Sequence, residues 1–162
     1  MRGKLYTLPG GVDTLKTYMR KFAQEGMCSH YVRRLGEIAL ERNGSKDQVV
    51  AVHSFLQSTF LYQPDPVERE LLISPIRFAE DYILDGVAHR GDCDDLATLG
   101  SAVLGSLGYK TRLLIVSYEV EPEHAYAEVW TDELGWISFD LASIGRPLGW
   151  DSNPTRVWYI AW

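Results

Sequence analysis

The spacing of apolar residues divides the chain into a helical first part and a strand-rich second part. Apolar side chains recur every three to four residues over 14–25 and 30–41, which predicts two amphipathic helices. Asp13 precedes the first helix as a candidate N-cap, and Asn43 lies where the second should end. We therefore expect an N-terminal helical segment over residues 1–46.

Further helices are expected before the middle of the chain. Ser45 and Asp47 are candidate caps of a third helix, which must end before the turn-rich residues 63–66. Ser74, followed by proline, introduces a short segment through Ile76, Phe78 and Tyr82.

A central helix is predicted from Asp94 to Leu107, where apolar residues again recur at helical spacing and Gly108 supplies a stop. Gly100 and Gly105 lie inside it, although each glycine costs about 1 kcal/mol of helix propensity relative to alanine. We interpret them as points of close packing against another backbone. This helix should therefore be buried.

The pattern changes in the last third of the chain. Residues 111–118, 124–130 and 136–141 are rich in β-branched and aromatic residues and are separated by polar turns, which predicts three antiparallel strands. With the central helix against this sheet, the fold class is α+β in a single domain, 1–162, and residues 145–162 form a C-terminal extension.

Composition limits the partners and the compartment. The chain has 162 residues, of which 46% are hydrophobic, and this suits one domain with one core. A net charge of -6 without a basic block argues against nucleic-acid binding. Met1–Tyr6 lacks the apolar run of a signal peptide, and no stretch has the roughly 20 apolar residues of a membrane span. We expect a cytoplasmic protein whose two cysteines, Cys28 and Cys93, are reduced.

Cys93 is the strongest candidate for chemistry. It lies in the sequence Gly-Asp-Cys-Asp-Asp at 91–95, a turn that opens the central helix. The positive end of a helix dipole and the free backbone N–H groups there favour the nucleophilic thiolate. Asp92 is the expected N-cap, and Asp95 is expected to bond back to the first turn. The pattern predicts covalent cysteine catalysis.

His124 and Asp140 can assist this thiol if the strand register permits it. If Trp130 pairs with Trp136, Tyr126 faces Asp140 and His124 lies diagonal to it, about 7–8 Å away at the backbone. Imidazole and carboxylate side chains bridge such a gap with one hydrogen bond. A shift by one residue would move Asp140 to the opposite face, so the register tests the assignment.

Metal chemistry is less favoured. The other histidines, His30, His53 and His89, are scattered and form no zinc motif. The cluster of Asp92, Asp94 and Asp95 lacks the glycine and the closing glutamate of an EF-hand calcium loop. We expect no metal and no cofactor.

Three blocks of sequence resemble the transglutaminase-like superfamily and occur in the order found in that family. They are GDCDDLA at 91–97, HAYAEV at 124–129 and WISFD at 136–140. The resemblance spans roughly residues 48–143. The chain resembles in particular the small stand-alone members of the superfamily found in bacteria and tailed phages. It implies a papain-like α+β core over residues 47–144.

The resemblance also implies roles for residues. Cys93 would be the nucleophile, His124 its base and then acid, and Asp140 the orienting carboxylate of a cysteine peptidase or amidase. This thiol-dependent hydrolase would act on peptide or isopeptide bonds of a peptide or protein substrate through an acyl-enzyme. The candidates for the second oxyanion donor, which the sequence does not separate, are Gln57, Tyr62 and Gln63.

Two departures from the family matter. Asp94 follows the nucleophile where the animal cross-linking enzymes have tryptophan, which favours hydrolysis over acyl transfer to an amine. Residues 85–90 lack the glutamine that precedes the cysteine in the papain branch. A non-catalytic alternative is a phage structural or morphogenesis module with a virion or assembly partner, located in the host cytoplasm or the virion. Such a module would be indicated if Tyr126, Trp130 or the C-terminal segment filled the groove beside Cys93.

Overall fold

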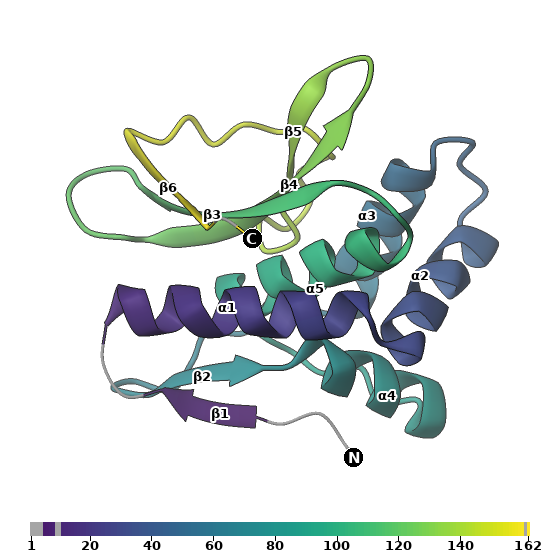
Figure 1. Ribbon diagram of the computed structural model, residues 1–162, viewed down its shortest axis with the longest axis horizontal. Coiled ribbons are helices and arrows are strands. Elements are labelled where there is room, and N and C mark those ends of the chain that lie inside the picture. The colour runs from purple at the N-terminus through teal and green to yellow at the C-terminus, as the bar shows by residue number, and fades with distance from the viewer. Residues whose placement is uncertain (1–4, 9–10, 161) are drawn as a thin grey trace.

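The computed structural model describes residues 5–8, 11–160 and 162, and shows a sheet packed on one side of a buried helix with further helices on the other side (Figure 1). The helices are α1 (Val12–Met27), α2 (His30–Arg42), α3 (Gln48–Thr59), α4 (Pro75–Asp85) and α5 (Cys93–Ser106). The strands are β1 (Leu5–Leu8), β2 (Glu70–Ile73), β3 (Thr111–Ser117), β4 (His124–Thr131), β5 (Gly135–Phe139) and β6 (Arg156–Ile160). The α+β class is confirmed.

The first turns of α3 and α4 are capped by side chains, whereas Ser29, the N-cap of α2, makes no side-chain cap hydrogen bond. The Asp47 carboxylate accepts hydrogen bonds from the backbone N–H groups at the start of α3, and the Ser74 hydroxyl does the same for α4. The prediction for Asp13 is wrong, because α1 already begins at Val12 with Gly11 in the N-cap position. Asp13 therefore lies in the first turn, where its carboxylate is 3.6 Å from the ammonium group of Lys16.

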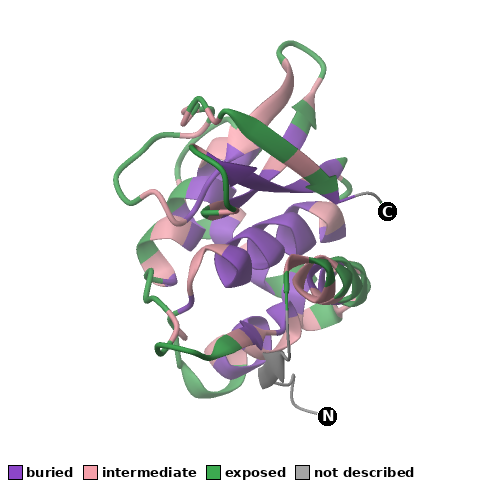
Figure 2. Ribbon diagram, turned by 90° about the vertical axis from the view of Figure 1, so that its left-hand side faces the viewer, coloured by how far each residue is buried: buried purple, intermediate pink, exposed green. Residues whose placement is uncertain are grey.

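Helix α5 lies at the centre of the molecule, with the sheet on one side and α1 beside it, and is buried along most of its length (Figures 1 and 2). The predicted close packing at its glycines is confirmed, but the neighbours are side chains and not another backbone. A Cβ atom on Gly100 would lie 2.9 Å from the ring of Phe139, and one on Gly105 would lie 2.6 Å from Cγ of Met27. Glycine thus leaves room on the helix for side chains of β5 and α1.

The main sheet has the strand order β5-β4-β3-β6, and all its neighbouring strands are antiparallel. Trp130 pairs with Trp136, so the predicted register is confirmed. β6 was not predicted as a strand, yet it pairs with β3 and brings Ile160 into the core. The second sheet, β1 with β2, was not predicted either.

No described helix is both long and apolar enough to cross a bilayer. The prediction about a signal peptide rested on Met1–Tyr6, of which residues 1–4 lie outside the described residues.

Candidate active site

Cys93 is the first residue of α5, and its position is set by the cap that precedes it. The Asp92 carboxylate accepts a hydrogen bond from the Asp95 N–H, and the Asp95 carboxylate accepts one from the Asp92 N–H at 3.2 Å. The predicted cap is therefore confirmed. Gly91 permits it, because a Cβ atom there would lie 2.6 Å from Cβ of Asp95. The result is a half-buried free thiol at a helix N-terminus.

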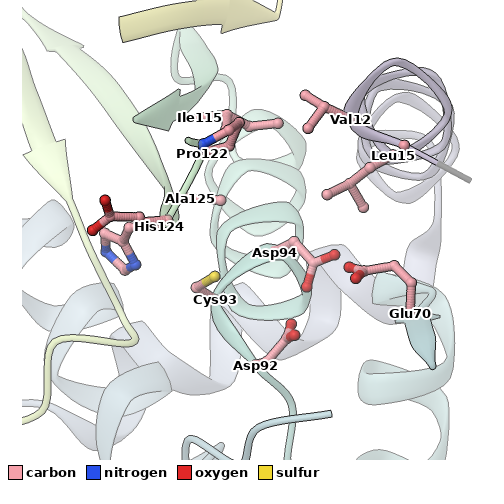
Figure 3. Close-up of a pocket in the computed structure, with 12 residues that line it drawn as sticks. Val12, Leu15, Glu70, Asp92, Cys93, Asp94, Ile115, Pro122, His124 and Ala125 are labelled. Atoms are coloured by element: carbon pink, nitrogen blue, oxygen red, sulfur yellow. The ribbon is translucent and has the colours of Figure 1, made fainter. Parts of the chain in front are cut away.

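His124 begins β4 and connects the thiol to Asp140. Its Nε2 atom donates to Oδ2 of Asp140 at 2.7 Å, as the register predicted. The Cys93 side chain also lies close enough to raise the pKa of this imidazole. Because Nε2 is used by Asp140, Nδ1 is the nitrogen that faces the thiol. Figure 3 shows His124 beside Cys93 at the edge of a cavity.

Asp140 lies just after β5 and is fixed by a tight turn as well as by His124. Its Oδ1 accepts from the N–H groups of Ala142 and Ser143, and its Oδ2 accepts from the Ser143 hydroxyl at 2.7 Å. Its backbone carbonyl accepts from Nε2 of His53 at 3.0 Å. With both carboxylate oxygens occupied, Asp140 has one available orientation toward His124.

The charges in this pair are mutually dependent. Burial disfavours charged His124, but the hydrogen bonds and charges of Asp140 and Cys93 outweigh burial and raise its pKa to about 10. Burial also disfavours charged Asp140, yet the contact with His124 keeps the pKa of Asp140 below its ordinary value. The pair is thus an imidazolium and a carboxylate at neutral pH, which suits the stabilisation of a thiolate.

The three oxyanion candidates lie in different places. The Gln57 amide nitrogen donates to backbone carbonyls of the turn that contains Asp140, with the Ser143 carbonyl at 3.1 Å, so its hydrogens are already used. Tyr62 pairs with Gly91 in an isolated bridge, and the Gln63 N–H donates to the Gly91 carbonyl at 2.8 Å. Burial and then the charges of Cys93 and Asp92 raise the pKa of Tyr62, so this phenol lies near the thiol.

Sequence reasoning missed several residues that support the site. The sequence indicated no role for His53 or for the side chain of Ser143, although both hold Asp140. His53 and Gln57 lie one helical turn apart on a largely apolar helix. This spacing could have indicated that both side chains bind the same polar group. Glu70, in β2, reaches the cavity beside Cys93 and carried no signal in the sequence.

A helix-borne cysteine, a strand histidine and an acid at the end of the next strand define a papain-like thiol centre. The sequence model of the transglutaminase-like superfamily matches residues 32–141, more than half of the chain, and the chain belongs to this superfamily. The resemblance inferred from the three sequence blocks is therefore confirmed.

Comparison with solved structures identifies a protein described as a "putative cysteine protease" from Cytophaga hutchinsonii. The two share 19% sequence identity with a TM-score of 0.49, and the alignment covers 78% of this chain and 45% of the other. The chain thus spans less than half the length of that protein. No curated protein sequence matches this chain.

Proposed function

We propose that this chain is a thiol-dependent hydrolase that cleaves peptide or isopeptide amide bonds through an acyl-enzyme. Cys93 is the nucleophile, His124 the base and then the acid, and Asp140 the orienting carboxylate. One observation carries the proposal: Asp140 hydrogen-bonds His124, and His124 lies beside Cys93 at an open cavity (Figure 3). Membership in the transglutaminase-like superfamily supports the same reaction class.

The reaction proceeds in two displacements. With the thiol proton on Nδ1 of His124, the thiolate attacks the carbonyl carbon of the amide, and the C–N bond then breaks as the imidazolium gives its proton to the leaving amine. His124 next takes a proton from water, whose oxygen attacks the thioester carbonyl. The C–S bond breaks, the acid product leaves and the thiol recovers the proton.

Two donors are placed to stabilise the tetrahedral oxyanion. Cys93 occupies the first position of α5, where a backbone N–H has no partner within the helix. The Tyr62 hydroxyl is the second donor in this proposal, because its segment lies beside Gly91 and its phenol is near Cys93. An oxyanion donor is typically worth about 3 kcal/mol of the barrier.

The contacts around the site favour catalysis over a binding module that only retains the fold. Tyr126 packs against Leu114 and Val116, and Trp130 packs on Trp136, so neither fills the cavity beside Cys93. Transfer of the acyl group to an amine would use the same residues, with an amine in place of water.

The test measures thiol reactivity before any substrate is known. At pH 7, iodoacetamide should alkylate half-buried Cys93 faster than exposed Cys28, and His124→Ala should slow alkylation of Cys93 by about 10²-fold without affecting Cys28. Mass spectrometry of the digested protein measures both sites in one sample. Cleavage of a peptide library by the wild type, absent in Cys93→Ala, would then establish hydrolysis. A Cys93 that reacts no faster than Cys28, independently of His124, would overturn the proposal.

A further inference from the structure

The cavity beside Cys93 has one apolar side and one acidic side. Its volume is about 340 Å³, and it lies between the start of α1, the first turn of α5 and the strands β3 and β4. Val12, Leu15 and Ile115 contribute the apolar side. Figure 3 shows the carboxyl groups of Asp92, Asp94 and Glu70 on the other side, with Cys93 and His124 across from them. Such a cavity is large enough for a single long side chain.

The carboxylates are closely spaced. One ligand oxygen each of Asp92, Asp94 and Asp95 lie within 4.8 Å of one another, and so do those of Asp65, Glu70 and Asp92. The Asp65 carboxylate accepts from the Leu71 N–H, and Asp95 accepts from the Ile73 N–H at 2.6 Å. Asp92 and Asp94 each accept from the Asp95 N–H through one oxygen. Glu70, Asp92 and Asp94 are the three of these five that line the cavity, which Glu123 also lines.

One carboxylate oxygen of Asp94 is buried without a hydrogen-bond partner among the described residues. Its side chain is only 2% exposed, and its Oδ1 accepts from the Asp95 N–H, but its buried Oδ2 has no hydrogen-bond donor. The side chain next to it is the Asp92 carboxylate, which is another acceptor. Burial, followed by the contact with Asp92 and the charges of Asp92 and Asp95, raises the pKa of Asp94 well above its ordinary value. A buried acceptor without a donor destabilises the fold, because it has lost water and gained no partner.

The described part of the chain does not supply that partner. The described lysine and arginine side chains that form ion pairs do so with other carboxylates, namely Asp13, Glu25, Glu37, Glu41, Asp81 and Glu128. Among these described pairs none reaches Glu70, Asp92 or Asp94. Within the described residues, the acidic side of the cavity thus has no cationic partner.

The geometry points to a cationic side chain of the substrate as that partner. Building on the proposed hydrolase function, we propose that the cavity binds a lysine or arginine side chain of the residue beside the scissile bond. The methylene stem lies along Val12, Leu15 and Ile115, and the cationic end reaches Glu70, Asp92 and Asp94. A bare divalent ion would use the carboxylates but would leave the apolar side without a function.

This arrangement also couples substrate binding to catalysis. Three carboxylates near the reacting carbonyl disfavour the negative charge that develops on its oxygen. A bound cation compensates for that charge, so a substrate with lysine or arginine gains in the transition state as well as in binding. The preference for lysine or arginine over uncharged side chains should consequently appear in kcat/KM, and part of it should appear in kcat.

The experiment compares two peptidyl substrates that differ only in lysine against its uncharged analogue norleucine, placed in turn on each side of the scissile bond. We expect the lysine substrate to have at least about tenfold higher kcat/KM at one of these positions. Asp94→Asn and Glu70→Gln should reduce the ratio to about one, mainly by slowing the lysine substrate. Glu133→Gln, at the distant hairpin between β4 and β5, is the matched control and should leave the ratio unchanged.

The possible failures are distinguishable. If iodoacetamide alkylation of Cys93 depends on His124 but lysine and norleucine substrates react equally, the cationic pocket is overturned and the hydrolase proposal stands. If alkylation does not depend on His124, the hydrolase proposal fails, and the substrate preference fails with it. If millimolar Ca²⁺ raises the Tm of the wild type but not of Asp94→Asn, and abolishes the preference for lysine, the cavity is a metal site and the substrate proposal is overturned.

Discussion

Two opposing influences act on the charge of His124. Burial favours the neutral imidazole, whereas the Asp140 carboxylate 2.7 Å away favours the imidazolium. The carboxylate is effective because the Ser143 hydroxyl and two backbone N–H groups hold it in place. The charge of His124 therefore depends on a turn at the end of a different strand.

Removing the charge of Asp140 should reverse this balance. Asp140→Asn keeps the shape of the side chain, so we expect the pKa of His124 to fall from about 10 toward the ordinary value of an imidazole or below it. NMR of the imidazole Cε1 proton across a pH series measures this change, with the signal of His30 as an internal reference. An unchanged titration of His124 would contradict the assigned pair.

The same substitution predicts a pH-dependent loss of stability. Since the pKa of folded His124 is above 6.5, its contribution is complete below pH 6.5 and is lost as the pH rises through about 10. Asp140 has a lowered pKa, so its contribution is present above 3.8 and is lost in acid. The free energy of unfolding of Asp140→Asn should thus fall short of wild type by about 2 kcal/mol between these limits and by less near pH 10. Urea denaturation at several pH values measures the difference, and a constant difference would exclude this mechanism.

Gln57 and Tyr62 should respond differently to substitution. Gln57→Leu removes donors to the turn around Asp140, and we expect it to lower the free energy of unfolding by about 1 kcal/mol. Tyr62→Phe leaves a 38% exposed ring in place, so stability should change little while kcat falls about 10²- to 10³-fold. Urea denaturation and turnover of a cleaved peptide separate the two effects. Gln63→Leu is the third variant. If it loses more kcat than Tyr62→Phe does, Gln63 and not Tyr62 is the oxyanion donor.

At the scale of elements, the position of the nucleophile depends on how α5 packs against the sheet. Its first residue is Cys93, and its middle contacts Phe139, the residue that precedes Asp140. Phe139 is fully buried and meets the ring of His53 edge to face. A displacement of this ring would move both the turn of Asp140 and the helix that carries the thiol.

Two glycines of α5 provide a matched test. Gly100→Ala would place a methyl group 2.9 Å from the ring of Phe139, which is fully buried, whereas Gly105→Ala meets Met27, a flexible and half-buried side chain. Both substitutions gain similar helix propensity. We expect Gly100→Ala to be less stable than Gly105→Ala by about 1–2 kcal/mol, and to slow alkylation of Cys93. Equal Tm values for the two variants would show that the ring relaxes.

For the molecule as a whole, the C-terminal strand closes one side of the main sheet. β6 pairs along β3, whose residues from Leu113 to Ser117 are all buried. Ile160, only 5% exposed, adds to the core. Without β6, an apolar strand with unpaired backbone groups would become a sheet edge, which favours association between chains.

Deletion of residues 154–162 should therefore produce aggregation. We expect the shortened chain to elute from size-exclusion chromatography as large species, and its Tm to be lower because buried apolar area is lost. Leu134→Ser, at the 73% exposed tip of the hairpin between β4 and β5, is the control and should elute as the wild type does. A deletion variant that elutes as the wild type would mean that β3 is protected in another way.

The sequence alone determined the features that depend on neighbours within a few residues. The cap of Asp92 and Asp95 follows from residues three positions apart, and α5 follows from its helical periodicity. Alternation along β4 and β5 put His124 and Asp140 on one face once Trp130 was paired with Trp136. Each of these rests on a local geometric period, which a sequence displays directly.

Only the tertiary structure decided what joins distant segments. The pairing of β6 with β3, the use of Gln57 in the Asp140 turn, and the approach of Glu70 to Asp94 link residues that no local period connects. Polar side chains such as Glu70 look alike in a sequence whether they face solvent or a cavity. The packing around α5 determines whether such a carboxylate faces solvent or a cavity. A carboxylate that is buried and loses its water needs a hydrogen-bond donor or a cation as its partner.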